Sequence, residues 1–136
     1  MSLHDNQLHQ QLMPKMAAYP IRSQAEEEDP LIVAKLFDVA GSATWWLTEY
    51  DPDERIAFAY VTGMWCDEWG SVSIDELYSL WMNFAWDPAR RLMRVRTTEP
   101  GIGIPRIELD ENFEPIRFSE VQARLAKYAA YADKTS

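Results

Sequence analysis

Histidine is almost absent from this chain. Of its 136 residues only His4 and His9 are histidines, so none follows residue 9. A Ser-His-Asp or Cys-His site needs a histidine beside its nucleophile, and the usual zinc sites use Cys and His ligands. Such sites are therefore excluded from the body of the chain, unless the N-terminal segment folds back into it. We predict no tightly bound transition metal, no cofactor and no covalent nucleophile.

Cysteine and long apolar runs are equally scarce. The single cysteine, Cys66, cannot form an internal disulfide, which favours a reducing cytoplasm. Its neighbours Asp67 and Glu68 have the wrong charge to stabilise a thiolate, so we expect a structural or idle thiol. No run approaches the roughly 18 apolar residues of a transmembrane helix, and the N-terminus does not resemble a secretory signal. We expect a cytoplasmic protein without a membrane partner.

Positive charge is in deficit. The chain has 13 Lys and Arg against 22 Asp and Glu, a net charge of −9. Phosphate backbones and anionic membranes repel such a chain at long range, so we expect no direct binding of nucleic acid. We interpret the basic island at 90–96 as balancing the acidic residues. The length and the apolar fraction of 47% are those of one globular domain, which we expect to span 1–136.

What the chain does have is a central region of alternating apolar and polar residues. The runs 31–37, 43–50 and 55–63 each read as a strand. Between the last two, Asp51-Pro52-Asp53-Glu54 has the residues of a type I turn. Together these signals predict a three-stranded antiparallel meander.

The turn also predicts the register. If Tyr50 pairs with Arg55, Leu47 lies opposite Phe58 on a nearly all-apolar face, which we expect to be the core. We therefore predict that Leu47 and Phe58 are buried together. The opposite face is mixed, and there Lys35 lies close enough to Trp46 for a cation–π contact.

Helices are predicted on both sides of this meander. We expect them at 6–19 despite Pro14, at 74–84 after the capping box of Ser73 and Glu76, and at 120–132. Residues 106–109 are expected to form a short strand. The predicted fold class is α+β, an antiparallel sheet packed with helices.

The mixed face and its adjoining loop are the predicted binding surface. Large aromatic residues rimmed by charge are a usual mark of an interaction site. The candidate residues are Lys35, Trp46, Thr48, Tyr50, Trp65, Glu68 and Trp69. In the alternative interpretation a helix of the same chain covers Trp46, and only the loop from Trp65 to Trp69 remains.

Several segments in order resemble a known family. They are DPLIVAKLFD, TWWLTEYDPDERIAFAYVTG, Glu68-x-Gly70, SIDEL at 73–77 and GIPRIELDENFEP. Over about 8–80 and 103–121 the chain resembles an uncharacterised bacterial family, domain of unknown function 2958, whose members are found largely on plasmids and other mobile elements. Ser71-Val72 and Leu109 depart from the family pattern, and 82–102 reads as an extra segment. The resemblance implies a context rather than a mechanism.

Three functions remain open. The favoured one is a non-catalytic protein-binding accessory of a mobile element, with an unidentified protein partner. A second is an acidic DNA mimic that blocks a host DNA-binding enzyme. A third is a hydrolase that uses two carboxylates from among Glu49, Glu68, Glu108 and Asp110.

Overall fold

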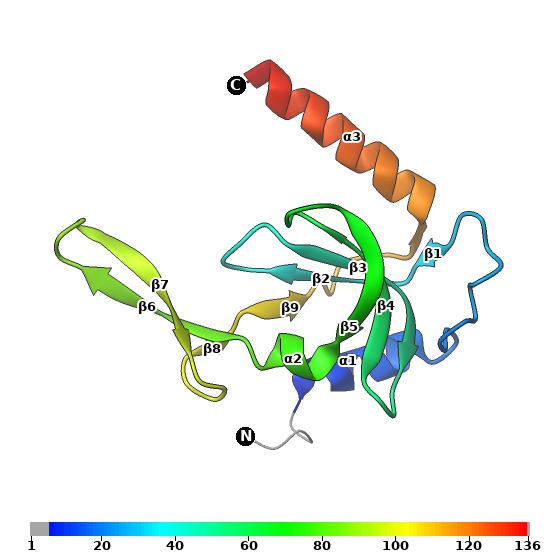
Figure 1. Cartoon of the computed structure of the whole chain (residues 1–136), viewed down its shortest axis with the longest axis horizontal. Helices are drawn as coiled ribbons and strands as arrows, with labels where there is room; N and C mark the ends of the chain where they lie inside the picture. The colour runs from blue at the N-terminus through cyan, green and yellow to red at the C-terminus, as the bar shows by residue number, and fades with distance from the viewer. Residues whose placement is uncertain (1–5, 136) are drawn as a thin grey trace.

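The chain folds into an α+β structure, as predicted, in which antiparallel sheets pack with helices. The structure is a computed structural model that describes residues 6–135. Its described helices are α1 (Gln7–Met16), α2 (Ile74–Tyr78) and α3 (Phe118–Thr135). Figure 1 shows α1 below the central sheet, a long hairpin projecting to one side, and α3 projecting upward from the body.

The central sheet has five strands in the order β5-β4-β3-β2-β9. These strands are β2 (Ala34–Asp38), β3 (Thr44–Asp51), β4 (Ile56–Thr62), β5 (Glu68–Ser73) and β9 (Ile107–Leu109). The predicted meander is confirmed as β2-β3-β4, and the predicted short strand is β9. We call the face of this sheet that α1 covers the inner face, and the opposite one the outer face.

Two smaller sheets extend the structure. The projecting one has the order β7-β6-β8, and the other pairs β1 with β10. Their strands are β6 (Trp81–Asp87), β7 (Leu92–Thr98), β8 (Ile104–Pro105), β1 (Leu31–Ile32) and β10 (Ile116–Arg117). Because β1 precedes the meander and β10 precedes α3, this second pair fixes the base of α3 beside the central sheet.

The turn between β3 and β4 has the predicted length but lies one residue further along the chain. Asp51 pairs with Ile56, rather than Tyr50 with Arg55. Arg55 takes a left-handed conformation, with φ of 57°, inside the turn. A residue that is not glycine rarely adopts this conformation, so the residue types did not indicate that Arg55 belongs to the turn rather than to the strand.

A bulge then shifts the register again within β3. The shift falls at Thr48, between Leu47 and Glu49, so that Leu47 lies opposite Ala59. Phe58 consequently lies on the outer face, half-buried and stacked on Trp69. The prediction that Leu47 and Phe58 are buried together is wrong, because one extra residue moves a side chain to the other face.

The inner face holds the larger core. Leu8, Leu12 and Met16 of α1 are buried there, as the four-residue spacing predicted, and they pack with the buried side chains of β2 and β3. The small side chains of Ala57 and Ala59 leave room for the helix. The predicted N-terminal helix is confirmed, although it ends at Met16.

The second helix is much shorter than predicted. Ser73 caps α2 by accepting a hydrogen bond from the Glu76 N–H at 3.1 Å, as the capping box predicted. The helix ends at Tyr78, however, and the chain from Trp81 onward pairs as β6 with β7. The prediction of helix to residue 84 is wrong, because cross-strand pairing with a distant segment overrides the local helical spacing.

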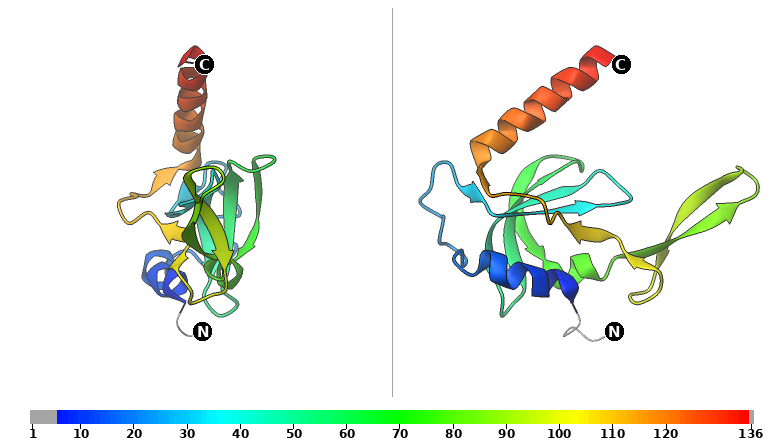
Figure 2. Two further views of the ribbon diagram at one scale, coloured as in Figure 1. Left: turned by 90° about the vertical axis from the view of Figure 1, so that its left-hand side faces the viewer. Right: turned by 180° about the vertical axis from the view of Figure 1, so that it is seen from behind.

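The base of α3 and the segment before it cover part of the outer face. The predicted C-terminal helix is confirmed and is longer than expected. A second core forms here around Ile32, Trp46 and Val121, with partly buried neighbours at Phe113, Ile116, Phe118 and Leu125. Seen from the side, the sheet lies between α1 on one side and the C-terminal segment on the other (Figure 2).

Asp29 holds the start of α3 in place. Its carboxylate accepts hydrogen bonds from the Ser119 N–H at 2.8 Å and the Ser119 hydroxyl at 2.6 Å. These bonds lower the pKa of Asp29 below its ordinary value. The Phe118 N–H donates to the Pro30 carbonyl at 2.8 Å. The Asp29 carboxylate and the Pro30 carbonyl, both distant in the sequence, therefore satisfy the first two N–H groups of the helix.

Candidate functional site

Trp46 is not exposed, contrary to the predicted binding surface. Only 9% of the residue is accessible, and Phe113 packs edge-on against its ring. Its Nε1 donates to the Thr62 hydroxyl at 3.0 Å. Lys35 lies over the ring, with Nζ 5.0 Å from the centroid, which confirms the predicted cation–π contact. The alternative interpretation therefore holds for Trp46 itself, which Phe113 and the base of α3 cover, but not for the whole face, because a groove beside Trp46 stays open.

Thr48 and Tyr50 are also buried, and the bulge separates them. Thr48 stays near the outer face, where its hydroxyl donates to the Phe58 carbonyl at 3.3 Å. Tyr50 turns to the inner face and joins the core beneath α1. Its placement on the mixed face is therefore wrong, for the same reason as the placement of Phe58.

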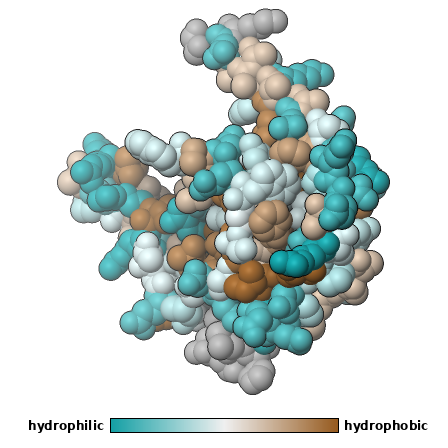
Figure 3. Space-filling model, turned by 45° about the vertical axis from the view of Figure 1, so that its right-hand side comes forward, coloured by the Kyte–Doolittle hydropathy of each residue, from teal (hydrophilic) through white to brown (hydrophobic). Residues whose placement is uncertain are grey.

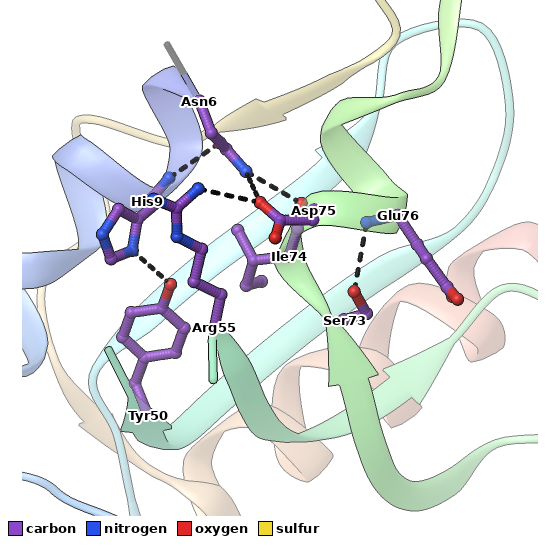
Figure 4. A network of polar contacts seen from close by, with 8 residues as sticks. All are labelled: Asn6, His9, Tyr50, Arg55, Ser73, Ile74, Asp75 and Glu76. Carbon is purple, nitrogen blue, oxygen red and sulfur yellow. Dashed lines mark hydrogen bonds and ion pairs between the residues drawn. The ribbon is translucent and has the colours of Figure 1, made fainter. Parts of the chain in front are cut away.

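The N-terminal segment does fold back onto the inner face, and there His9 joins a polar network that the sequence analysis did not predict. His9 of α1 lies with Nδ1 2.7 Å from the Tyr50 hydroxyl. Figure 4 shows Asn6 and Arg55 converging on Asp75, at 2.8 and 3.1 Å from one of its carboxylate oxygens. Burial, and next the charge of Arg55, lower the pKa of His9, and burial raises the pKa of Tyr50.

This network joins elements rather than forming a reaction centre. It connects α1 to β3 through His9 and Tyr50, and to α2 through Asn6 and Asp75. His9 and Tyr50 are both buried, and neither lines the two grooves described next. We therefore interpret the network as structural.

The outer face carries an open groove beside the covered Trp46. Its floor is aromatic: Phe58 stacks on Trp69 with ring centroids 5.6 Å apart, and Trp69 contacts Phe118 at 4.7 Å. The groove measures about 620 Å³. Its lining comes from the segment before β1, from the sheet and from α3: Ile21, Arg22, Gln24, Ala25, Glu27, Glu28, Pro30, Thr48, Glu49, Phe58, Trp69 and Phe118. In Figure 3, brown apolar surface lies in the middle of the molecule below α3, bordered by teal hydrophilic side chains.

The one buried carboxylate of this groove is already engaged. Glu49 accepts hydrogen bonds from the Arg22 N–H at 3.0 Å and the Gln24 N–H at 2.9 Å. Gln24 in turn donates to the Thr48 and Leu31 carbonyls. Glu49 therefore holds the groove wall in place, and the remaining groove carboxylates belong to the exposed side chains Glu27 and Glu28.

Two of the other candidate acids meet in a second groove, at the β9 edge. Glu108 and Asp110 both line it, together with residues of α1, and its volume is about 480 Å³. Asp110 has Lys35 Nζ 3.8 Å from its carboxylate. Glu49 and Glu68 do not line this groove, so the structure divides the four candidate carboxylates.

The predicted loop site is exposed at the end of the sheet. Trp65 is 101% accessible, Cys66 is exposed, and Glu68 is exposed at the start of β5. Trp69 points instead into the aromatic floor of the outer-face groove. Of the predicted binding residues, only Thr48 and Trp69 line that groove. Correct register would have added Phe58, whereas Phe118 had no signal in the sequence.

The chain matches a family described as "Protein of unknown function (DUF2958)" over residues 3–100. It therefore belongs to the DUF2958 family, as the sequence segments indicated. The match runs through the β6–β7 hairpin, so our interpretation of 82–102 as an extra segment is wrong up to residue 100. The segment 103–121, which also suggested the resemblance, lies outside the match.

Other comparisons add no function. No curated protein and no solved structure matches the chain. Within residues 6–135 no helix is both long and apolar enough to cross a membrane. The same part of the chain holds no group of three or more His, Cys, Asp or Glu residues that would suit a metal ion.

Proposed function

We propose that this chain is a non-catalytic protein-binding accessory of a mobile element, and that the outer-face groove receives an apolar anchor of its partner. The observation that carries the proposal is the open aromatic floor of Phe58, Trp69 and Phe118. Protein interfaces concentrate their binding energy in a few large side chains that fill such pockets. The mobile-element context comes from the family resemblance.

The charges of the rim specify the partner further. Glu27 and Glu28 are exposed on the groove wall, and the chain as a whole is acidic. A partner segment with a Lys or Arg next to its apolar anchor would therefore be favoured over an acidic one. We infer a basic segment with an aromatic or branched apolar side chain.

Selection of peptides from a random displayed library against the intact chain tests this proposal. We expect enriched peptides to combine an aromatic or aliphatic residue with adjacent Lys or Arg, and to shift the backbone resonances of β4 and β5. Phe58→Ala should weaken their binding about tenfold or more, because the floor of the groove is lost. Tyr128→Ala, at an exposed aromatic residue of α3, is the matched control and should leave binding unchanged.

A second variant keeps the proposal testable if Phe58→Ala does not fold. Glu27→Lys with Glu28→Lys changes only exposed side chains and should reverse the charge preference of the selected peptides. Peptides that bind Phe58→Ala and the charge-reversed chain as well as the original would overturn the proposal.

The two alternatives have less support. A DNA mimic needs carboxylates spaced like phosphates along one surface, whereas the acids at 26–29, 53–54 and 110–114 lie in separate loops or turns. The hydrolase has one specific observation in its favour, the shared groove of Glu108 and Asp110. Hydrolysis of a glycoside panel that is abolished by Glu108→Gln would favour this enzyme over the binding module.

A further inference from the structure

The β6–β7 hairpin exposes a row of large apolar side chains. It projects away from the central sheet, clear of α1 and α3 (Figures 1 and 2). Phe84 pairs with Val95 and Trp86 with Met93, so these four side chains share one face. Each is between 43 and 58% exposed. Nothing in the described chain covers this face, which we call the apolar hairpin face.

The opposite face of the hairpin is basic. Ala85 pairs with Arg94 and Asn83 with Arg96, which places both arginines on the side away from Phe84. With the turn arginines 90 and 91, four arginines and one aspartate give residues 81–98 a net charge of +3. The whole chain carries −9, so the remainder carries −12. The hairpin is therefore a positive projection on a strongly negative body.

β7 also has an open edge. It is the outermost strand in the order β7-β6-β8, and among residues 6–135 it pairs only with β6. Every second residue of an edge strand directs its N–H and C=O away from the sheet, where they can pair with an added strand. Because β7 carries arginines, we expect this edge to favour an acidic strand and to disfavour a basic one.

We propose that the β7 edge binds an extended segment of a partner protein in which apolar residues alternate with Asp or Glu. Successive side chains of an added strand point to opposite faces of the sheet. Its apolar residues would extend the apolar hairpin face beside Val95 and Met93. Its carboxylates would lie on the other face, beside Arg94 and Arg96, where opposite charges on neighbouring strands attract.

The same geometry disfavours other occupants. Pairing of β7 with β7 of a second copy would place arginines beside arginines. A nucleic acid strand on the basic face could not stack on Phe84 or Trp86, which point the opposite way. An anionic membrane attracts the hairpin but repels the body, which carries −12.

This inference rests on the proposed protein-binding function but concerns a different surface. The outer-face groove is built by the segment before β1, by β3, β4 and β5 and by α3, and it takes a basic segment, whereas the β7 edge takes an acidic one. Variants of the two surfaces therefore fail separately. Phe58→Ala should not affect binding at β7, and arginine variants of β7 should not affect the groove.

Synthetic peptides against the intact chain test the inference. The probe is a labelled peptide that alternates Glu and Val, compared with one of the same composition in which Glu and Val form two blocks, and with one that alternates Lys and Val. We expect the alternating acidic peptide to bind, to protect amide hydrogens of residues 92–98 from exchange, and to bind more weakly as salt is added.

Charge reversal supplies the decisive variant. Arg94 and Arg96 are exposed, so Arg94→Glu with Arg96→Glu should preserve the fold. The variant should bind the acidic peptide at least about tenfold more weakly and should gain binding of the alternating Lys peptide. Arg124→Glu, at an exposed arginine of α3, is the matched control and should change neither.

Three results would overturn the inference. The first is equal binding of the block and alternating peptides. The second is self-association of the chain that the arginine variant abolishes. The third is binding of an oligonucleotide or of anionic vesicles, lost in the same variant, without binding of the acidic peptide.

Discussion

His9 illustrates how one side chain can be misjudged from its position in a sequence. It lies outside the body of the chain by number, yet the hydrogen bond to Tyr50 spans 41 positions and is buried. The sequence shows that no histidine follows residue 9. It could not show that α1 folds onto the sheet with His9 turned inward, because that depends on packing of the whole helix.

The stability of the fold should depend on pH through His9. Burial keeps the pKa of His9 below 6.5 in the folded chain, so the unfolded chain binds the proton more readily as pH falls. The contribution is fully present above about pH 6.5 and is lost as pH falls toward the folded pKa. Denaturant unfolding at about pH 7.5 and about pH 5.5 should show a loss for the original chain and a smaller one for His9→Gln. Equal losses in both chains would contradict this.

Trp46 shows which features of a residue the sequence could predict and which it could not. The Lys35–Trp46 contact was predictable because both residues lie on neighbouring strands, and Lys35 does pair with Trp46. The burial of Trp46 was not, because the covering residue Phe113 lies far along the chain. Local alternation reports which side chains share a face, and it does not report what lies over that face.

At the scale of elements, the β3–β4 and β6–β7 hairpins have turns of the same kind. In each, an Asp-Pro pair is followed by two residues and an arginine in the left-handed conformation, with φ of 57° at Arg55 and 55° at Arg91. The Asp51 and Asp87 side chains each accept hydrogen bonds from the N–H groups two and three residues on. The repeated Asp-Pro-x-x-Arg pattern could have indicated the second hairpin. The helical spacing of apolar residues at 74–84 instead led to the wrong prediction of a helix up to residue 84.

The attachment of α3 depends on the Asp29 carboxylate. Asp29→Ala removes the acceptor for the Ser119 N–H and hydroxyl, and should loosen β10 and the first turn of α3. Amide hydrogen exchange at residues 116–121 should become faster, while exchange in α1 stays the same. Glu120→Ala, at an exposed residue of the same turn, is the matched control. Unchanged exchange at 116–121 in Asp29→Ala would refute this role.

This attachment should also respond to acid. The hydrogen bonds from Ser119 lower the pKa of Asp29 in the folded chain, so its contribution is present above the ordinary pKa of 3.8 and is lost as pH falls through the folded value. Exchange at 116–121 should therefore approach that of Asp29→Ala only in strong acid. The sequence could not reveal the contact, since 90 positions separate the two partners.

At the scale of the whole molecule, one sheet separates two cores. Leu12 belongs to the inner core, and Val121 belongs to the outer one. Sequence alternation predicted an apolar face with helices on it, which is the inner core. The outer core needs residues 113–125 to return over Trp46, and the spacing of apolar residues contained no sign of that return.

The two cores should contribute independently to stability. Leu12→Ala should cost about 2–5 kcal/mol and Val121→Ala about 1–3 kcal/mol, as buried large-to-small changes do. Because the sheet lies between them, the double variant should lose the sum of the two within about 0.5 kcal/mol. Chemical denaturation of the four chains measures this. A coupling above about 1 kcal/mol would show that the cores act as one unit.

The order in which α1 and α3 occur in the chain has a consequence for its folding during synthesis. α1 is made before the strands that it covers, so the inner face can be shielded as soon as the meander pairs. Val121 is made about 75 residues after Trp46, a delay of about 4–15 s at ordinary rates of translation. During that interval the nascent chain presents Trp46 uncovered. We therefore expect a chaperone that acts at the ribosome to bind the outer face of the sheet around Trp46.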